Sequence, residues 1–359
     1  MPVEVLSPSL YQVLLAALFL TLAGVAAGQE LPPPVRLVTP VEYQVFQQDA
    51  AGQALVPVRV DNAPNLPDAQ VRFVVAGACK GATTDWANLA PRAAEGHMLA
   101  QVPLTAGGWY ELWFRANEQA DPQRLLERVG VGEVFVTAGQ SNAANWGLVK
   151  HVAQDPRVVS YYAGQWQPAQ DPMPGAGGSD GSIWPLLGDM LARNLQVPIG
   201  FACVAVGGSA SAQWVPGGEF YPLLVNTLRE LGPGGARAVL WHQGESDIRD
   251  GTSARQYYDN LHSIVMSLRE QMAWSPRWVV AGVAWWAGLP EAAPIPLEAQ
   301  ERLWREGLAL EGPYTDDIGP EFRDGSHFNE AGLVMHAERW FALLWAQIYA
   351  KVPLVVRGE

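Results

Sequence analysis

The pattern of hydrophobic and polar positions changes near residue 129, and the two patterns predict two kinds of fold. Before that point short apolar runs alternate with polar residues and are separated by turn residues, as in Leu55–Val60, Val71–Val75 and Gly108–Arg115. Alternation with a period of two is typical of half-buried strands. Closely spaced strands without helical periodicity predict a small Ig-like β-sandwich over residues 29–128.

After residue 129, strand-like apolar runs alternate with helical periods. The runs are Val131–Ala138, Ile199–Val206, Ala238–Trp241 and Trp278–Ala284. Such alternation predicts a parallel sheet that is covered by helices on both faces. Residues 129–359 are therefore expected to form an α/β domain with a flavodoxin-like parallel sheet.

The helices expected between these runs show one apolar face each. One face is formed by Trp184, Leu187, Leu191 and Leu195, and another by Tyr257, Leu261, Ile264, Leu268 and Met272. A third helix contains Leu297, Trp304 and Leu308, and the last is expected from about residue 330 to residue 349. Apolar residues spaced by three or four positions line up on one side of a helix and pack against the sheet.

The first residues predict export. Val13–Ala23 is an apolar segment of signal-peptide length, and the small residues in Val25–Gly28 suit signal peptidase. We therefore expect a signal peptide over residues 1–28 and a secreted or periplasmic protein. The leading segment lacks Lys and Arg and contains Glu4, so a misassigned start codon and an uncleaved N-terminal membrane anchor remain alternatives. No later run is long and apolar enough to span a membrane.

Charge and cysteine content narrow the possible partners. The net charge is -13 and no long basic cluster occurs, which argues against nucleic acid and against anionic membrane surfaces. The two cysteines, Cys79 and Cys203, fall in different predicted modules, so free thiols are favoured over a disulfide. No metal-ligand spacing such as CxxC or HxxxH occurs, and no metal is predicted.

Polar and glycine-rich clusters follow the predicted strands of the second module. Gly139–Asn142 follows the first strand, Gly207–Ser211 the second and His242–Asp247 the third, while Asp324–His327 precedes the last helix. Open parallel sheets bind ligands beyond the carboxyl ends of their strands. Four segments that are distant in sequence are therefore expected to meet at one edge of the sheet.

These clusters contain the groups that acyl transfer needs. A serine hydroxyl becomes a nucleophile when a base takes its proton. Ser141 is the candidate nucleophile, His327 the base, and Asp324 the carboxylate that orients the imidazole. The candidate oxyanion donors are the backbone N–H groups of Ser141 and of Gly207 or Gly208, together with the amide of Gln243. The choice between the two glycines stays open, and a standard GxSxG elbow is not supported.

The four clusters resemble motifs of the SGNH hydrolase superfamily, and more narrowly of its sialate O-acetylesterase-like carbohydrate esterases. The matching residues are Gly139–Asn142, Gly207–Ser209, Trp241–Asp247 and Asp324–Asn329, so the resemblance covers about residues 132–349. It implies ester hydrolysis by Ser141, His327 and Asp324 without a metal or other cofactor. Ala143 and His242 depart from the usual methionine and tyrosine, and neither departure removes a reacting group.

Other polar and aromatic residues near the motifs have two possible roles each. Gln243 can serve the oxyanion or satisfy backbone groups, and Glu245 is expected to hold a loop or to pair with an arginine. Ser209 is the rival nucleophile, but no base is apparent for it. The candidate substrate contacts are Asn142, Trp146 and Trp214, with Trp184 as a further possible sugar platform.

The predicted function is removal of acetyl groups from a sialate- or xylan-type glycan through a serine acyl-enzyme. The partner is then an acetylated carbohydrate. The alternatives are an esterase or lipase that acts on non-sugar esters and a non-catalytic glycan-binding protein. The identity of the sugar and the oligomeric state are left open.

Overall fold

The computed structural model describes residues 35–61, 66–92, 97–232, 234–283, 285 and 295–350. The predicted signal peptide over residues 1–28 lies outside these ranges and stays a prediction. Within the described ranges, no helix combines the length and the apolar composition needed to cross a membrane.

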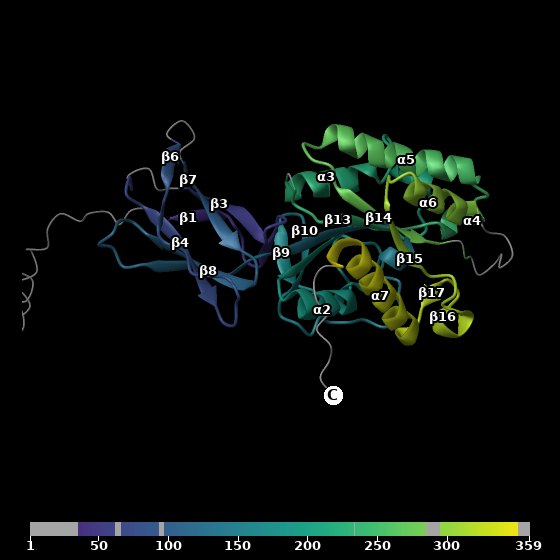
Figure 1. Cartoon of the computed structure of the whole chain (residues 1–359), viewed down its shortest axis with the longest axis horizontal. Coiled ribbons are helices and arrows are strands. Elements are labelled where there is room, and N and C mark those ends of the chain that lie inside the picture. Colours follow the sequence, from purple (N-terminus) through teal and green to yellow (C-terminus); the bar gives the residue numbers. More distant parts are fainter. Residues whose placement is uncertain are drawn as a thin grey trace, which may run out of the picture.

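The N-terminal module is a two-layered β-sandwich, as predicted (Figure 1). One layer contains β1 (Arg36–Thr39), β3 (Gln53–Asp61), β7 (His97–Thr105) and β6 (Ala90–Arg92). The other contains β2 (Gln44–Gln47), β4 (Gln70–Ala76), β5 (Ala87–Asn88), β8 (Gly108–Arg115) and the first half of β9 (Gln123–Gly139). Alternate residues of these strands, such as Val58, Phe73 and Leu112, are fully buried in a common core.

The second module has an α/β fold, as predicted. Its sheet has the strand order β11-β10-β12-β9-β13-β14-β15, and every neighbouring pair is parallel except β10 and β11. These strands are β10 (Val158–Tyr162), β11 (Gln165–Pro168), β12 (Ile199–Cys203), β13 (Ala238–His242), β14 (Arg277–Gly282) and β15 (Leu310–Tyr314). Because the chain leaves β9 first toward one side and later toward the other, the carboxyl end of β9 is a topological switch point.

Helices cover both faces of this sheet. Figure 1 shows α3 (Tyr221–Leu231), α5 (Ala254–Gln271) and α6 (Ile295–Arg305) above the sheet and α2 (Trp184–Leu195) and α7 (Glu330–Leu344) below it. The predicted faces of α2 and α5 are buried, apart from partly exposed Leu195 at the end of α2. Two hydrophobic cores, one on each face, therefore hold the sheet between the helices.

The structure refines several predicted element ends. Leu308 lies beyond the end of α6, and the last helix passes into a π-helical turn over Trp345–Tyr349. The strand predicted to reach Val206 ends at Cys203. Ala284, predicted as the end of a strand, lies outside the described residues.

One continuous strand, β9, joins the two modules. Its first half pairs with β8 of the sandwich, and its second half lies between β12 and β13 of the α/β sheet. The boundary expected between residues 128 and 129 falls within this strand. The modules are thus linked by hydrogen-bonded backbone.

A buried ion pair fixes this link. The Glu133 carboxylate on β9 has no exposed surface and accepts hydrogen bonds from Arg237 Nε at 2.6 Å and Nη2 at 2.8 Å. It also accepts hydrogen bonds from the side-chain amides of Gln47 at 3.1 Å and Gln48 at 2.6 Å. Gln47 is the last residue of β2, and Gln48 follows it. Arg237, Gln47 and Gln48 are thus all held by hydrogen bonds to the one Glu133 carboxylate.

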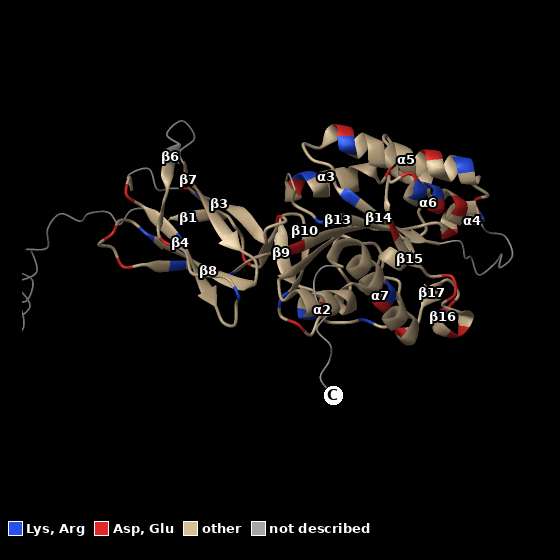
Figure 2. Ribbon diagram, viewed as in Figure 1, with Lys and Arg blue, Asp and Glu red and all other residues tan. Residues whose placement is uncertain are grey.

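Charged residues are spread over the surface of the molecule. Figure 2 shows acidic and basic residues interspersed along the ribbons of α3, α5 and α6. The two cysteines are free thiols, with Cys79 half-buried in the sandwich and Cys203 buried in β12. Burial raises the pKa of the Cys203 thiol to about 12.

Arg237→Met should destabilise the protein by about 3–5 kcal/mol, because it leaves the buried Glu133 carboxylate without its counter-charge. Denaturant unfolding followed by tryptophan fluorescence measures the loss. Arg255→Met is the control, since the Arg255 side chain is 89% exposed beside Asp259 and should contribute at most about 1 kcal/mol. Equal stability of the two variants would contradict the role given to the Glu133 network.

Candidate functional site

The Ser141 loop is fixed between the ends of two neighbouring strands. Gly139, the last residue of β9, accepts at its carbonyl from the Val206 N–H at 3.0 Å, and the Gln140 N–H donates to the His242 carbonyl at 3.0 Å. Gly139 has a φ of 124°, and a Cβ atom there would lie 2.1 Å from the His242 carbonyl oxygen. Glycine is therefore required, and Ser141, two residues later, starts a short 3-10 helix (Ser141–Ala143).

Ser141 opens into a cavity of about 520 Å³ at the carboxyl edge of the sheet. The cavity is lined by Gln140, Ser141, Trp146, Gly207, Gly208, Ser246, Arg249, Asp324, Gly325, Ser326 and His327. It thus combines residues from all four segments that the sequence predicted to converge. A cavity of this size accommodates a small sugar or a short acyl ester.

His327 and Asp324 enter the cavity from a small hairpin outside the main sheet. The strands β16 (Arg323–Asp324) and β17 (His327–Phe328) pair so that Asp324 lies opposite His327. Gly325 makes the turn with a φ of 59°. Asp324 is exposed and His327 is half-buried. In the described part of the chain, no hydrogen bond joins His327 to Ser141 or to Asp324, so the groups share the cavity without being locked together.

Arg323 holds this hairpin in place, a role that the sequence analysis missed. Its guanidinium donates to the carbonyls of Ile318 at 2.8 Å, Thr315 at 2.8 Å and Ser326 at 3.0 Å. It also lies over the Phe328 ring, 3.9 Å from the ring centroid. One buried arginine thereby fixes the backbone on both sides of the histidine.

The environment of His327 favours its neutral form. Burial lowers the pKa of the imidazole, and the negative charges of Glu245 and Asp324 offset this only in part. The Trp146 ring lies against the imidazole with a centroid distance of 5.4 Å and an interplanar angle of 31°. A neutral imidazole can accept a proton, as a general base must.

Three backbone N–H groups at the cavity are free. Those of Ser141, Gly207 and Gly208 donate to no acceptor within the described part of the chain. Gly208 has a φ of 71° and open space where a side chain would be, whereas a Cβ atom at Gly207 would lie 2.5 Å from Trp146 Nε1. These donors can bind an anionic oxygen, and both glycines remain candidates.

The structure does not bring the Gln243 amide into this cavity. Its side chain is fully buried, and Nε2 donates to Gln140 Oε1 at 3.2 Å, the Ser209 carbonyl at 3.1 Å and Asp247 Oδ2 at 2.6 Å. These acceptors leave no amide proton for an oxyanion. The predicted donor role is therefore corrected to a bracing role among three loops.

Gln140 completes this brace, which the sequence analysis also missed. Its Oε1 accepts from the backbone N–H groups of Gly244 at 3.3 Å and Ser246 at 3.0 Å. Asp247 in turn accepts from the N–H of Ser211 at 2.8 Å and from its hydroxyl at 2.7 Å. Buried polar groups that satisfy one another in this way hold the loops after β9, β12 and β13 in one arrangement.

Two predicted substrate contacts are also corrected. Asn142 is buried, and its Nδ2 donates to Glu245 Oε1 at 2.7 Å and to the Ser326 carbonyl at 3.1 Å, so it links the Ser141 loop to the hairpin. Trp214 has no exposed surface, and its Nε1 donates to Ser209 Oγ at 2.9 Å. Neither side chain is available to a sugar.

Of the tryptophans considered, Trp146 has the position that sugar contact requires. It is 39% exposed and lines the cavity, so the predicted contact remains a prediction. Trp184 is fully buried and donates to the Ala143 carbonyl at 2.9 Å, which places it in the support of the Ser141 loop. Ser209 is buried and accepts from Trp214, which agrees with its rejection as a nucleophile.

A buried polar chain lies behind the cavity. Glu245 Oε1 is 3.5 Å from His242 Nε2, and His242 Nδ1 is 3.1 Å from His336 Nε2. Trp340 Nε1 donates to the same His336 nitrogen at 3.0 Å. Burial raises the pKa of Glu245, but the hydrogen bond and charge of His242 outweigh this, and the pKa is lowered. Glu245 thus holds its loop, as the sequence predicted, although its partners are Asn142 and His242.

The comparisons with known proteins agree with this geometry. Residues 131–288 match the family model described as SASA, carbohydrate esterase, sialic acid-specific acetylesterase. This match confirms the family resemblance. It includes the segments of Ser141, Gly207 and Gln243, whereas the hairpin of Asp324 and His327 lies beyond it. The matched family is one of carbohydrate esterases, which agrees with the predicted ester hydrolysis.

Individual relatives cover parts of the chain. A probable carbohydrate esterase of Arabidopsis thaliana is 36% identical over 76 residues, which span 21% of this chain and 29% of that protein. The crystal structure of a carbohydrate acetylesterase from Xanthomonas citri has 19% identity and a TM-score of 0.55 over 86% of this chain and 74% of its own. A crystal structure of an Arabidopsis thaliana protein has 20% identity and a TM-score of 0.47 over 60% of this chain and 98% of its own. The Xanthomonas citri structure supports the fold described above.

Gln243→Ala should lower thermal stability and leave kcat of the folded protein near that of the wild type. The change leaves buried acceptors without their donor, at a cost of about 1–3 kcal/mol. Melting temperature and turnover of 4-nitrophenyl acetate are measured on one preparation, with exposed Gln271→Ala as the control. A loss of 100- to 1000-fold in kcat at unchanged melting temperature, typical of a lost oxyanion donor, would restore the original assignment.

Proposed function

We propose that this protein is a carbohydrate O-acetylesterase that works through a serine acyl-enzyme. The observation that carries the proposal is the 520 Å³ cavity in which Ser141, His327 and Asp324 meet beside free backbone N–H groups. The family match supports ester hydrolysis on carbohydrates. The proposal includes export of the protein, which the apolar N-terminal segment of the sequence supports.

In the proposed mechanism the neutral His327 takes the Ser141 proton as the hydroxyl attacks the acetyl carbonyl. The negative charge on the carbonyl oxygen is stabilised by the N–H groups of Ser141 and of Gly207 or Gly208. As the ester C–O bond breaks, His327 gives this proton to the departing sugar oxygen, which leaves as a hydroxyl group. Water, deprotonated by the same imidazole, releases acetate and restores the serine. Asp324, opposite His327 in the hairpin, orients the imidazole and stabilises its cation.

The substrate is proposed to be an acetylated glycan of sialate or xylan type. A panel of acetylated sialic acid, acetylated xylan and simple acyl esters separates these choices by the rate of acetate release. Preference for longer non-sugar acyl esters would favour a general esterase. Glycan binding without acetate release from any member would favour a non-catalytic binding protein.

Ser141→Ala should abolish hydrolysis and leave the fold intact, because in the proposed mechanism the acyl-enzyme forms on the Ser141 hydroxyl. Loss of such a serine costs roughly a million-fold in kcat in extreme cases. Release of 4-nitrophenol from its acetate gives the rate, and circular dichroism checks the fold. Ser326→Ala is the control at a second serine of the same cavity. A folded Ser141→Ala protein with the wild-type rate would remove the serine assignment.

The acidic limb of kcat/KM should lie below the ordinary histidine pKa of about 6.5. The folded environment lowers the pKa of His327, so the imidazole stays unprotonated, and active as a base, to a lower pH than free histidine. Protonation removes the base, and the rate must fall as the pH drops through that lowered value. A limb displaced above 6.5 would contradict the burial effect. His262→Asn, at a histidine of α5 distant in sequence from every motif, should leave the limb unchanged.

A further inference from the structure

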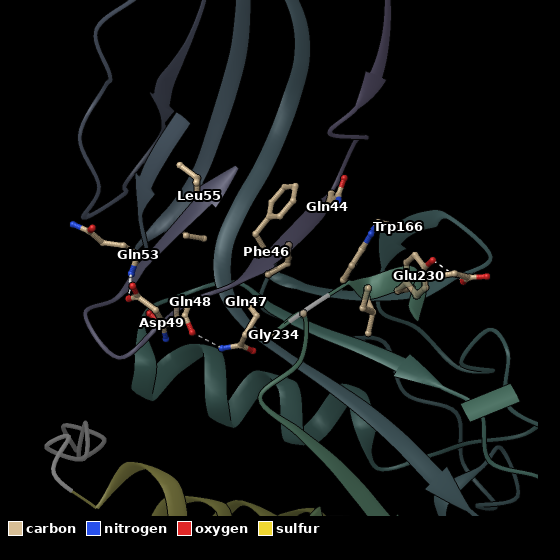
Figure 3. Close-up of a pocket in the computed structure, with 15 residues that line it drawn as sticks. Gln44, Phe46, Gln47, Gln48, Asp49, Gln53, Leu55, Trp166, Glu230 and Gly234 are labelled. Atoms are coloured by element: carbon tan, nitrogen blue, oxygen red, sulfur yellow. Dashed lines mark hydrogen bonds between the residues drawn. The ribbon is translucent and has the colours of Figure 1, made fainter. Parts of the chain in front are cut away.

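A second cavity lies at the seam between the β-sandwich and the α/β module. It has a volume of about 470 Å³, and we call it the seam pocket. Figure 3 shows Phe46, Asp49 and Leu55 of the sandwich on one side and Trp166 and Glu230 of the α/β module on the other. Binding cavities are often formed where two modules meet.

The seam pocket is separate from the Ser141 cavity. Gln47, in its wall, pairs with Gly132 in the middle of β9, whereas Ser141 follows the carboxyl end of that strand. At about 3.3 Å per residue, the seven residues from Gly132 to Gly139 span roughly 23 Å. One small sugar is too short to reach both places, whereas a longer oligosaccharide has the length to do so.

The wall of the seam pocket combines an apolar surface with unused polar groups. The rings of Tyr161 and Trp166 pack with a centroid distance of 5.0 Å, and Leu55 is 60% exposed. Trp166 is only 8% exposed, yet its indole N–H donates to no acceptor within the described part of the chain. Tyr161 donates to Glu230 Oε2 at 2.8 Å, which fixes the carboxylate, and the other Glu230 oxygen accepts no hydrogen bond from the residues that the structure describes.

The charges of the wall select the ligand class. Asp49 and Glu230 contribute carboxylates, and no Lys or Arg occurs among the lining residues, all of which are described. An anionic ligand would meet these carboxylates without a compensating cation. A neutral sugar instead offers hydroxyl groups to the carboxylates and C–H faces to the apolar wall.

The seam pocket is also rigid before any ligand arrives. Its sandwich side is β2, which pairs with β9 from Gln44 to Gln47. The side-chain amides of Gln47 and Gln48 turn away to the buried Glu133 carboxylate. A wall that is already ordered binds a ligand with little loss of conformational entropy.

We infer that the seam pocket binds a neutral oligosaccharide segment of the glycan. The inference rests on the proposed function only in assigning this segment to the same glycan that carries the acetyl groups. A chain held at the seam pocket raises the effective concentration of its acetylated units at Ser141. The site therefore matters for polymeric substrates and is irrelevant to a small ester.

Titration calorimetry with xylohexaose and cellohexaose tests the inference on the full-length protein. Glu230→Gln removes the charge at an exposed position and should weaken binding on the order of tenfold, as expected for a hydrogen bond to a charged group. Ala54→Trp fills the cavity and should abolish binding. Melting temperatures establish that each variant is folded. Asp259→Asn, on the exposed side of α5, is the control and should bind like the wild type.

The hydrolytic readout is independent of this binding test. Both pocket variants should hydrolyse 4-nitrophenyl acetate at the wild-type rate and release acetate from polymeric acetylated xylan more slowly. Absence of wild-type binding to both hexaoses, unchanged binding in the folded Glu230→Gln and Ala54→Trp variants, or tighter binding of trigalacturonate would overturn the inference. An inactive wild-type protein that still binds at the seam pocket would overturn the proposed function alone.

Discussion

The structure depends on β9 serving as a strand of two modules at once. A strand shared in this way must satisfy its backbone hydrogen bonds first with β8 and later with β12 and β13. The change of strand partners occurs around Glu133. Its carboxylate has no exposed surface and accepts hydrogen bonds from Arg237 and from two glutamine amides. Removing such a charge from water is costly, and only the full set of partners offsets that cost.

The same strand sets the position of the nucleophile. Its last residue, Gly139, is hydrogen-bonded to the loop after β12 and lies against the end of β13. Ser141 is therefore held close to the centre of the sheet. The histidine is supported in another way, by a two-strand hairpin held by Arg323. The nucleophile and the base are thus brought to one cavity by two independently supported parts of the fold.

Much of the fold was predictable because buried parallel strands and amphipathic helices leave clear periodic patterns. The strands β9, β12, β13 and β14 are apolar runs, and the predicted face of α5 is the buried one. The strand β15, Leu-Glu-Gly-Pro-Tyr, contains no such run and exists because it pairs with β14. The helix α3 was missed although Tyr221, Leu224, Val225 and Leu228 carry the helical spacing.

The candidate site was predictable to the level of loops but not of side-chain directions. Motif positions relative to the strands indicated that the segments of Ser141, Gly207, Asp324 and His327 would meet at one edge of the sheet, and these residues line one cavity. The position of Gln243 does not reveal whether its amide turns toward the cavity or toward Gln140 and Asp247. That choice depends on acceptors from other loops, which only the folded chain brings together. Trp214 illustrates the same limit, because an aromatic residue after a motif can face a ligand or the core.

The buried polar chain from Glu245 through His242 and His336 to Trp340 determines where protons lie on the two imidazole rings. Trp340 donates to His336 Nε2, so this nitrogen carries a lone pair, and His242 Nδ1 beside it must carry a proton. The other nitrogen of His242 faces the Glu245 carboxylate, and two lone pairs there would repel each other. One proton placed between His242 and Glu245 removes this repulsion. The fully buried acid beneath Ser141 then belongs to a continuous line of polar contacts that reaches Trp340, instead of facing an apolar interior.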